Sequence, residues 1–253
     1  MSAKILYQKQ AEFPIGTLTF NRPERLNALD SEAMSLFADQ IHALKDEPLA
    51  ALIITGAGDK AFCSGGDLSD LATRRTAADA EAMITLMGDA LIALENLPYP
   101  VIAAINGYAL GGGSEISLAC DLRILGANAR LGFVQAKRGL TPGWGAGQRL
   151  LRLVGYARAL DLLLNATILS AEDALALGIA NRIAPAGESL SAALEFAAQI
   201  AALDPAVIRS LKTLLRAGLT MPYEQAIQTE RQLFPPLWVG EAHQRSLDEF
   251  LNR

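Results

Sequence analysis

Two glycine-rich turns are the first places in this sequence where backbone groups could do chemistry. The apolar run at residues 49–55 leads into Ser64-Gly65-Gly66-Asp67, and the apolar run at residues 101–105 leads into Gly111-Gly112-Gly113. Glycine lets a backbone approach a ligand closely, and a helix N-terminus carries unpaired N–H groups at a positive dipole end. Two such turns facing one another could direct two N–H groups at one oxygen, which would be an oxyanion hole. From the spacing alone, tight turns or close packing explain these glycines equally well.

Three other kinds of site are disfavoured by their surroundings. Residues 53–61 match a strand followed by G-x-G-x-x-A, but the glycine-rich loop continues to Asp67, whereas a dinucleotide site needs a helix to begin at once. Neither Ser64 nor Ser114 has glycine two residues away on both sides, so the nucleophile elbow of serine hydrolases is absent. The two cysteines and two histidines are too few for a Cys/His metal cage, so no metal is expected.

The composition limits the possible partners. Of 253 residues, 51% are hydrophobic and only 19% are charged, against a usual charged share of about 25%, which indicates that some surface is hidden against other subunits. The net charge is −5, and no basic block is longer than Arg74-Arg75, so nucleic acid is not an expected partner. No apolar run approaches the ~20 residues of a membrane span, and residues 1–13 lack the apolar region of a signal peptide. We therefore expect a soluble, cytoplasmic protein with no membrane partner.

The elements that must position the two turns alternate between strand and helix. Strands are expected at residues 5–10, 15–20, 49–55, 101–105, 121–125 and 181–184, and helices after Asp30, over residues 78–97 and 116–119, and from Ser170 to Gly178. The strands at residues 49–55 and 101–105 show no alternation, which is typical of buried parallel strands. Residues 56–67 and 139–147 are expected as loops, and beyond Gly187 only helices are expected. This order predicts an α/β core over residues 1–190 and a helical C-terminal region over residues 191–253.

Three blocks of the sequence resemble the signature blocks of the crotonase (enoyl-CoA hydratase/isomerase) superfamily. They are NRPERLNAL at residues 21–29, AFCSGGDL at residues 61–68 and AINGYALGGGSE at residues 104–115, in the family's order and spacing. The resemblance implies a spiral of ββα units with a C-terminal helical region that builds homotrimers, often paired into hexamers. It also implies an enzyme that acts on an acyl-CoA thioester, with coenzyme A as part of the substrate and no separate cofactor.

The resemblance also implies roles for particular residues. The backbone N–H groups of Gly66 and Gly112 match the family's oxyanion hole, which holds the thioester carbonyl oxygen and in which one donor is worth about 10²–10³ in rate. Glu115 matches the first of the two carboxylates of the hydratases. The residues expected beside the coenzyme A moiety are Arg25, Leu26, Ala28, Ser64, Asp67, Leu68, Tyr108, Val134, Gly139 and Leu140. For Asp67, anchoring its own turn is favoured over catalysis.

Gln135 is the point at which the chain departs from the hydratases. Alignment on Gly132 and Gly139 places Gln135 where the second hydratase glutamate should stand. Hydration of a double bond needs one group to activate water and another to deliver a proton, and a neutral amide does neither readily. Decarboxylation of a malonyl-type thioester needs only the oxyanion hole, a pocket for the departing carboxylate and a proton donor. Residues 133–145 and 204–212 resemble the ethylmalonyl-CoA decarboxylase branch more than the hydratase branch.

The leading hypothesis is therefore a lyase that decarboxylates a small branched malonyl-CoA of the ethylmalonyl or methylmalonyl type. Gly66 and Gly112 would stabilise the enolate, and Glu115 would orient the substrate or protonate the carbanion. An enoyl-CoA hydratase or isomerase is the alternative. A non-catalytic acyl-CoA or RNA-binding paralogue is less favoured, because the glycine pair and Glu115 are present and no basic surface is evident. Trp144 either walls the acyl pocket or packs in the core.

Overall fold

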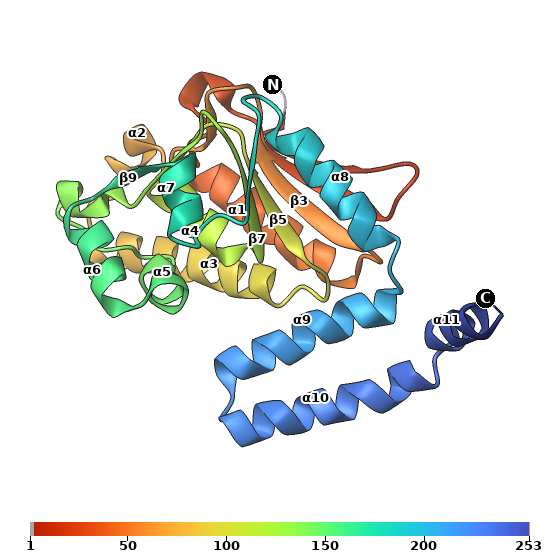
Figure 1. Cartoon of the computed structure of the whole chain (residues 1–253). Helices are drawn as coiled ribbons and strands as arrows, with labels where there is room; N and C mark the ends of the chain where they lie inside the picture. The colour runs from red at the N-terminus through yellow and green to blue at the C-terminus, as the bar shows by residue number, and fades with distance from the viewer. Residues whose placement is uncertain (1–2, 253) are drawn as a thin grey trace.

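The computed structural model describes residues 3–252, which form two sheets surrounded by helices, with a helical hairpin extending from this core (Figure 1). The larger sheet has the order β1-β2-β3-β5-β7-β10, and only β1 runs antiparallel to its neighbour. Its strands are β1 (Ile5–Lys9), β2 (Ile15–Phe20), β3 (Ala51–Gly56), β5 (Val101–Ile105), β7 (Leu122–Gly126) and β10 (Arg182–Ala184). Both β3 and β5 are buried along their whole length, as their unbroken apolar sequences predict.

A second sheet has four short strands, and two of them lead directly into the glycine turns. Its strands are β4 (Ala61–Cys63), β6 (Tyr108–Leu110), β8 (Arg130–Gly132) and β9 (Ile168–Ser170), in the order β4-β6-β8-β9. Each of β3, β5 and β7 is followed in the chain by one of these short strands. The expected loop over residues 56–67 is therefore wrong at β4, because a three-residue strand is too short to show an alternating pattern.

Helices cover both faces of the larger sheet and also form the C-terminal extension. They are α1 (Ser31–Ala43), α2 (Leu68–Leu71), α3 (Ala77–Glu95), α4 (Gly112–Ala119), α5 (Ala146–Val154), α6 (Tyr156–Leu164), α7 (Ala171–Ala176), α8 (Ser189–Ala201), α9 (Pro205–Thr220), α10 (Tyr223–Trp238) and α11 (Glu241–Leu251), with short 3₁₀ turns η1 (Pro23–Arg25), η2 (Leu44–Asp46) and η3 (Val134–Arg138). Alternate residues of the strands face opposite ways. Leu52 and Ile54 share a cluster with α1 and α3, whereas Ile53 and Ile102 share one with α8.

Two helices begin earlier than the sequence predicted. Helix α4 begins at Gly112 rather than at residue 116, and α5 begins at Ala146, inside the expected loop. Glycine has a low intrinsic helix propensity, so a helix that begins with glycines is hidden from pattern reading. By contrast, Asp30 caps α1 as expected, since its side chain accepts a hydrogen bond from the Ala33 N–H at 2.9 Å.

The C-terminal helices differ in how they contact the core. Helix α8 lies on the sheet, whereas α9 and α10 form a hairpin that projects away from it, with α11 at its end (Figure 1). Lys212 of α9 attaches the hairpin to the core, because its ammonium group donates to Asp121 Oδ2 at 2.7 Å and to the Tyr99 carbonyl at 2.9 Å. Across residues 3–252, no single helix is both long and apolar enough to cross a membrane, and only α8 with α9, bent by 107°, would qualify as a pair by length and composition.

Candidate functional site

The two glycine turns meet at the start of α4. Gly65 has φ of +98°, and a Cβ atom there would lie 3.0 Å from both the Gly112 nitrogen and the Leu110 carbonyl oxygen. Glycine is therefore required at Gly65 by conformation and by space. A Cβ on Gly113 would lie 1.9 Å from the Cys63 carbonyl oxygen, so this glycine is needed for the same close approach from the other side.

The N–H groups of Gly66 and Gly112 are both available to a ligand. Gly66 bridges to Leu29, but the bonds of this bridge run from the Leu29 N–H to the Gly65 carbonyl and from the Asp67 N–H to the Leu29 carbonyl, each 2.8 Å. Gly112 is the first residue of α4, where an N–H has no acceptor within the helix. Within the described part of the chain neither N–H donates a hydrogen bond, and both glycines are half-buried rather than buried. Two free donors thus lie on adjacent turns.

Asp67 holds the first turn in place. Its Oδ2 accepts from Arg22 Nη2 at 2.9 Å, and its Oδ1 accepts from the Ser69 N–H at 3.0 Å, which caps α2. Burial alone would raise the pKa of Asp67, but the Arg22 guanidinium and the Ser69 N–H outweigh it and lower the pKa below its ordinary value. Arg22 also donates to the Ala28 carbonyl at 2.6 Å. Arg22, which was not among the predicted site residues, therefore joins two of the predicted segments.

Glu115 lies on α4, one turn after Gly112, and is 3% exposed. Both of its oxygens are occupied by donors. Oε1 accepts from Gln135 Nε2 at 3.0 Å and from the Gly143 N–H at 3.3 Å, and Oε2 accepts from the N–H groups of Trp144 at 2.7 Å and Ala146 at 3.1 Å. Burial raises the pKa of Glu115 above its ordinary value, although these four donors oppose the shift. The N-cap residue of α5 is Gly145, which has no side chain to accept a hydrogen bond. The Glu115 carboxylate therefore caps the start of this helix instead.

Gln135 lies on η3 beside Glu115, so the structure brings together the pair that the sequence predicted. The amide nitrogen faces the Glu115 carboxylate. The amide oxygen is buried and accepts no hydrogen bond from residues 3–252. The arrangement thus contains one carboxylate and one neutral amide rather than two carboxylates.

Trp144 closes one side of the glycine site. A Cβ atom on Gly112 would lie 2.2 Å from Trp144 Cζ3 and 2.5 Å from Cη2, so the indole ring packs directly on the Gly112 Cα. The side chain of Trp144 belongs to the main hydrophobic cluster and the residue is 5% exposed. Packing in the core and lining the site, the two roles left open by the sequence, are therefore compatible in this structure.

The residues predicted to contact coenzyme A lie in several environments. The Ser64 N–H donates to the Leu26 carbonyl at 3.1 Å, so the segments at residues 25–28 and 64–68 run side by side. Ala28 is buried, which leaves only its backbone for contacts, whereas Arg25, Leu26, Leu68, Tyr108 and Leu140 are exposed. Val134 is half-buried at the start of η3, and Gly139 ends it with φ of +71°.

A cavity of about 280 Å³ lies between the short strands and the loop that carries Leu26. It is lined by Leu26, Asp59, Lys60, Gly107, Tyr108, Asn128 and Arg130. Leu26 and Tyr108 were predicted, whereas the cations Lys60 and Arg130 were not. No sequence motif marks these two residues, which are 70 positions apart and meet because β6 pairs with both β4 and β8.

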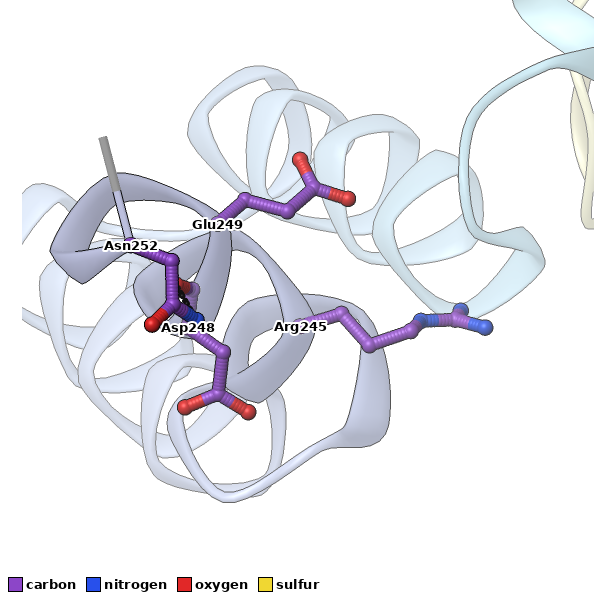
Figure 2. A pocket seen from close by; sticks show the side chains of 4 residues that line it. All are labelled: Arg245, Asp248, Glu249 and Asn252. Atoms are coloured by element: carbon purple, nitrogen blue, oxygen red, sulfur yellow. Dashed lines mark hydrogen bonds between the residues drawn. The ribbon is translucent and has the colours of Figure 1, made fainter.

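A separate hollow lies on α11. Figure 2 shows that Arg245, Asp248 and Glu249 of this helix line it, together with Asn252 at the helix C-cap. In Figure 1, α11 lies at the end of the C-terminal helices, away from α4 and the glycine turns. The hollow is therefore not part of the glycine site.

The chain belongs to the Enoyl-CoA hydratase/isomerase family, whose sequence pattern matches residues 10–253. It is 34% identical to the short-chain-enoyl-CoA hydratase of Clostridium acetobutylicum over 96% of this chain and 94% of that protein. It is 35% identical to the ethylmalonyl-CoA decarboxylase of Gallus gallus over 92% of this chain and 79% of that protein. The fold matches the crystal structure of an enoyl-CoA hydratase from Bacillus anthracis with a TM-score of 0.93 and 31% identity, over 99% of this chain and 96% of that one. The predicted superfamily and the crotonase fold class are thus confirmed.

Proposed function

We propose that this protein is an acyl-CoA lyase that stabilises a thioester enolate and that its reaction is the decarboxylation of a small branched malonyl-CoA. The observation that carries the proposal is the pair of unpaired N–H groups at Gly66 and Gly112, half-buried on adjacent turns. Donors fixed in this way stabilise negative charge that develops on an oxygen, and they need no reorganisation during the reaction.

The cavity beside Leu26 and Tyr108 supports coenzyme A as the carrier of the acyl group. Lys60 and Arg130 bring two positive charges to its wall, against one negative charge from Asp59. Arginine and lysine are the side chains that most often bind phosphate groups, and coenzyme A carries phosphates at the end remote from the thioester. The substrate would then extend from these cations to the glycine turns.

In the proposed reaction, the bond between the substrate's α-carbon and its free carboxylate breaks, and carbon dioxide leaves. The electron pair of that bond passes to the thioester, whose carbonyl oxygen becomes an enolate oxygen held by the two N–H groups. The α-carbon then takes up one proton. Glu115 lies one turn after Gly112 on α4, and burial raises the pKa of its carboxyl group although four donors oppose the shift. To supply this proton it would have to release one of those donors; otherwise it would orient the substrate while water supplies the proton.

Decarboxylation is favoured over hydration by the contacts of Glu115 and Gln135. Hydration needs a base that can take a proton from water, yet both oxygens of Glu115 are already bonded to four donors. The neighbouring amide of Gln135 is not a useful base. Decarboxylation generates the enolate without any base, so it does not depend on a free carboxylate at this position.

Hydration of a short enoyl-CoA is the second candidate, and the resemblance to the hydratase of Clostridium acetobutylicum favours it. That relative matches this chain over nearly the full length of both proteins. For hydration to proceed, Glu115 would have to exchange one of its present donors for a water molecule. A structural change of this kind would be expected only when substrate is bound.

The ratio of the two activities tests the proposal. Methylmalonyl-, ethylmalonyl- and crotonyl-CoA are incubated with the protein, and the products are identified by mass spectrometry. We expect decarboxylation of a malonyl-type thioester and poor hydration of crotonyl-CoA. Gln135→Glu should raise hydration, by about 10²–10⁴ if it restores an acid–base group, and should weaken decarboxylation because its charge repels the substrate's carboxylate.

Gln8→Glu is the matched control, since it adds the same charge on the exposed end of β1. It should leave both activities unchanged. Fast native hydration of crotonyl-CoA that Gln135→Glu does not alter would contradict decarboxylation and favour hydration. Absence of turnover together with tight acyl-CoA binding would favour the non-catalytic alternative.

A further inference from the structure

The geometry points to Trp144 as the residue that limits the length of the acyl group, and we propose that the site accepts short acyl chains and rejects long ones. This inference rests on the proposed function, because it places the thioester carbonyl on the N–H groups of Gly66 and Gly112. It goes further by assigning the wall that determines which acyl groups fit.

The ring stands beside the position proposed for the carbonyl oxygen. It packs on the Gly112 Cα, where an added Cβ would lie 2.2 Å from Cζ3, 2.5 Å from Cη2 and 3.0 Å from Cε3. This Cα is bonded directly to the nitrogen whose N–H would hold the oxygen. An acyl chain bound there begins within a few atoms of the indole ring, so extension of the chain toward α5 meets the ring.

The backbone of Trp144 is held on both sides by charged groups. Its N–H donates to Glu115 Oε2 at 2.7 Å, and its carbonyl accepts from Arg149 Nη1 at 2.6 Å. Arg149 is itself fixed by Glu95 of α3, whose Oε1 accepts from its Nε at 2.7 Å. Hydrogen bonds to charged groups are worth more than neutral ones, so displacement of this backbone is unfavourable.

The neighbouring residues restrict the loop further. A Cβ on Gly143 would lie 3.0 Å from Ile84 Cγ2, which places the loop directly against α3. Gly145 has φ of +99°, a conformation that fixes the entry into α5. Since Trp144 as a residue is only 5% exposed, its ring forms a packed wall rather than a mobile cover. Inserting extra methylenes against such a wall is unfavourable because the surrounding atoms have no free space.

Glu115 acquires a positioning role from these contacts. A single buried carboxylate accepts hydrogen bonds from Gln135 of η3 and from the loop that carries Trp144. The position of the wall relative to Gly112 therefore depends on Glu115 as well as on the packing of the ring.

Binding of saturated acyl-CoA thioesters tests the wall without requiring any reaction. Acetyl-, butyryl-, hexanoyl- and octanoyl-CoA can neither lose carbon dioxide nor add water, so their dissociation constants report fit alone. Titration calorimetry is performed on the native protein, Trp144→Ala, Trp144→Phe and Tyr156→Ala. Tyr156 is the control because it is an aromatic residue that is 72% exposed on α6.

We expect the native protein to bind octanoyl-CoA at least about tenfold more weakly than butyryl-CoA, as overpacking predicts. Trp144→Ala should remove or reverse this difference, Trp144→Phe should reduce it, and Tyr156→Ala should leave it unchanged. If Trp144→Ala does not fold, the Phe variant and the native series still decide the question. Equal binding of butyryl- and octanoyl-CoA by the native protein would contradict the claim that Trp144 limits the length of the acyl group. An unchanged ratio of the two dissociation constants in a folded Trp144 variant would contradict it as well. Failure of every acyl-CoA to bind the native protein would instead overturn the proposed function.

Discussion

The glycine turns and the C-terminal helices differ strongly in how far their residues are buried and bonded. At the turns, backbone groups are fixed by buried charges, with Asp67 paired to Arg22 and Glu115 bonded to four donors. In contrast, α10 and α11 have no buried residue, and α9 has only Ile208, Lys212 and Ala217. The contacts that hold the turns lie within this chain, whereas the helices expose apolar residues such as Leu215 and Phe234. The candidate site is thus held by long-range contacts within one chain, while the C-terminal helices leave apolar surface exposed.

The largest effect is expected from Gly112→Val. Its side chain would collide with the Trp144 ring and with a bound thioester, and it would displace the N–H from the carbonyl oxygen. Loss of one such donor should lower kcat/KM by about 10² or more. Steady-state kinetics on the substrate identified from the acyl-CoA panel measures this loss.

Gly147→Ala is the control for that change. Gly147 lies in α5, and a Cβ atom there would have no neighbour within 4 Å. We expect its activity to be normal and its melting temperature to be equal or slightly higher, because alanine favours the helix. A folded Gly112→Val protein with near-normal turnover of every acyl-CoA would contradict the proposal that the glycine turns form an oxyanion hole.

The next largest effect is expected on assembly, through the C-terminal helices. We expect sedimentation to give the mass of a trimer or hexamer, because the apolar residues of the C-terminal helices would pack on neighbouring subunits. Leu215→Glu, on α9, should lower this mass, whereas Leu164→Glu, on α6 of the core, should not. The two leucines are similarly exposed, at 67% and 70%, so they differ mainly in the region they occupy. A stable native monomer at micromolar concentration would contradict the assembly prediction.

The smallest effect should be found at Asp67, when the pH is lowered. The pKa of this carboxyl is below its ordinary value, so its contribution to stability is present above pH of about 4 and is lost as the pH falls through the folded-state pKa. Asp67→Asn should therefore cost about 1–2 kcal/mol near neutral pH, and progressively less as the medium becomes more acidic. Urea unfolding between pH 7 and pH 3 would show the two stability curves converging. Curves that stay parallel would mean that the ionisation of Asp67 does not contribute to stability.

Much of the core could be predicted from the sequence because its signals are local. Each of these signals is contained in a short segment of the chain: the apolar runs of β3 and β5, the Asp30 cap and the glycine blocks. These local features require no knowledge of how distant parts of the chain meet. The pairing of Gln135 with Glu115 was expected only from the resemblance to the crotonase superfamily, in which alignment on Gly132 and Gly139 places Gln135 at the second carboxylate's position.

Features that depend on distant contacts were missed. The strands β4, β6, β8 and β9 are stable as a sheet, but each is too short to be recognised alone. Nothing in the sequence indicates that the N–H groups at residues 143–146 would occupy Glu115, or that Lys60 and Arg130 would line one cavity. The assembly of the C-terminal helices stays a prediction for the same reason, since its contacts would lie between chains.

Polarisation of a bound thioester carbonyl tests whether Gly66 and Gly112 form an oxyanion hole. Butyryl-CoA does not react, and subtracting the infrared spectrum of the complex labelled with ¹³C at the carbonyl carbon from that of the unlabelled complex isolates its C=O stretching band from the protein's bands. With the native protein at saturation, two hydrogen bonds to the oxygen should move this band to lower frequency than in free butyryl-CoA. In Gly112→Val, at equal occupancy, the band should return toward the free position. An unshifted band in the saturated native protein would contradict the assignment of these two N–H groups.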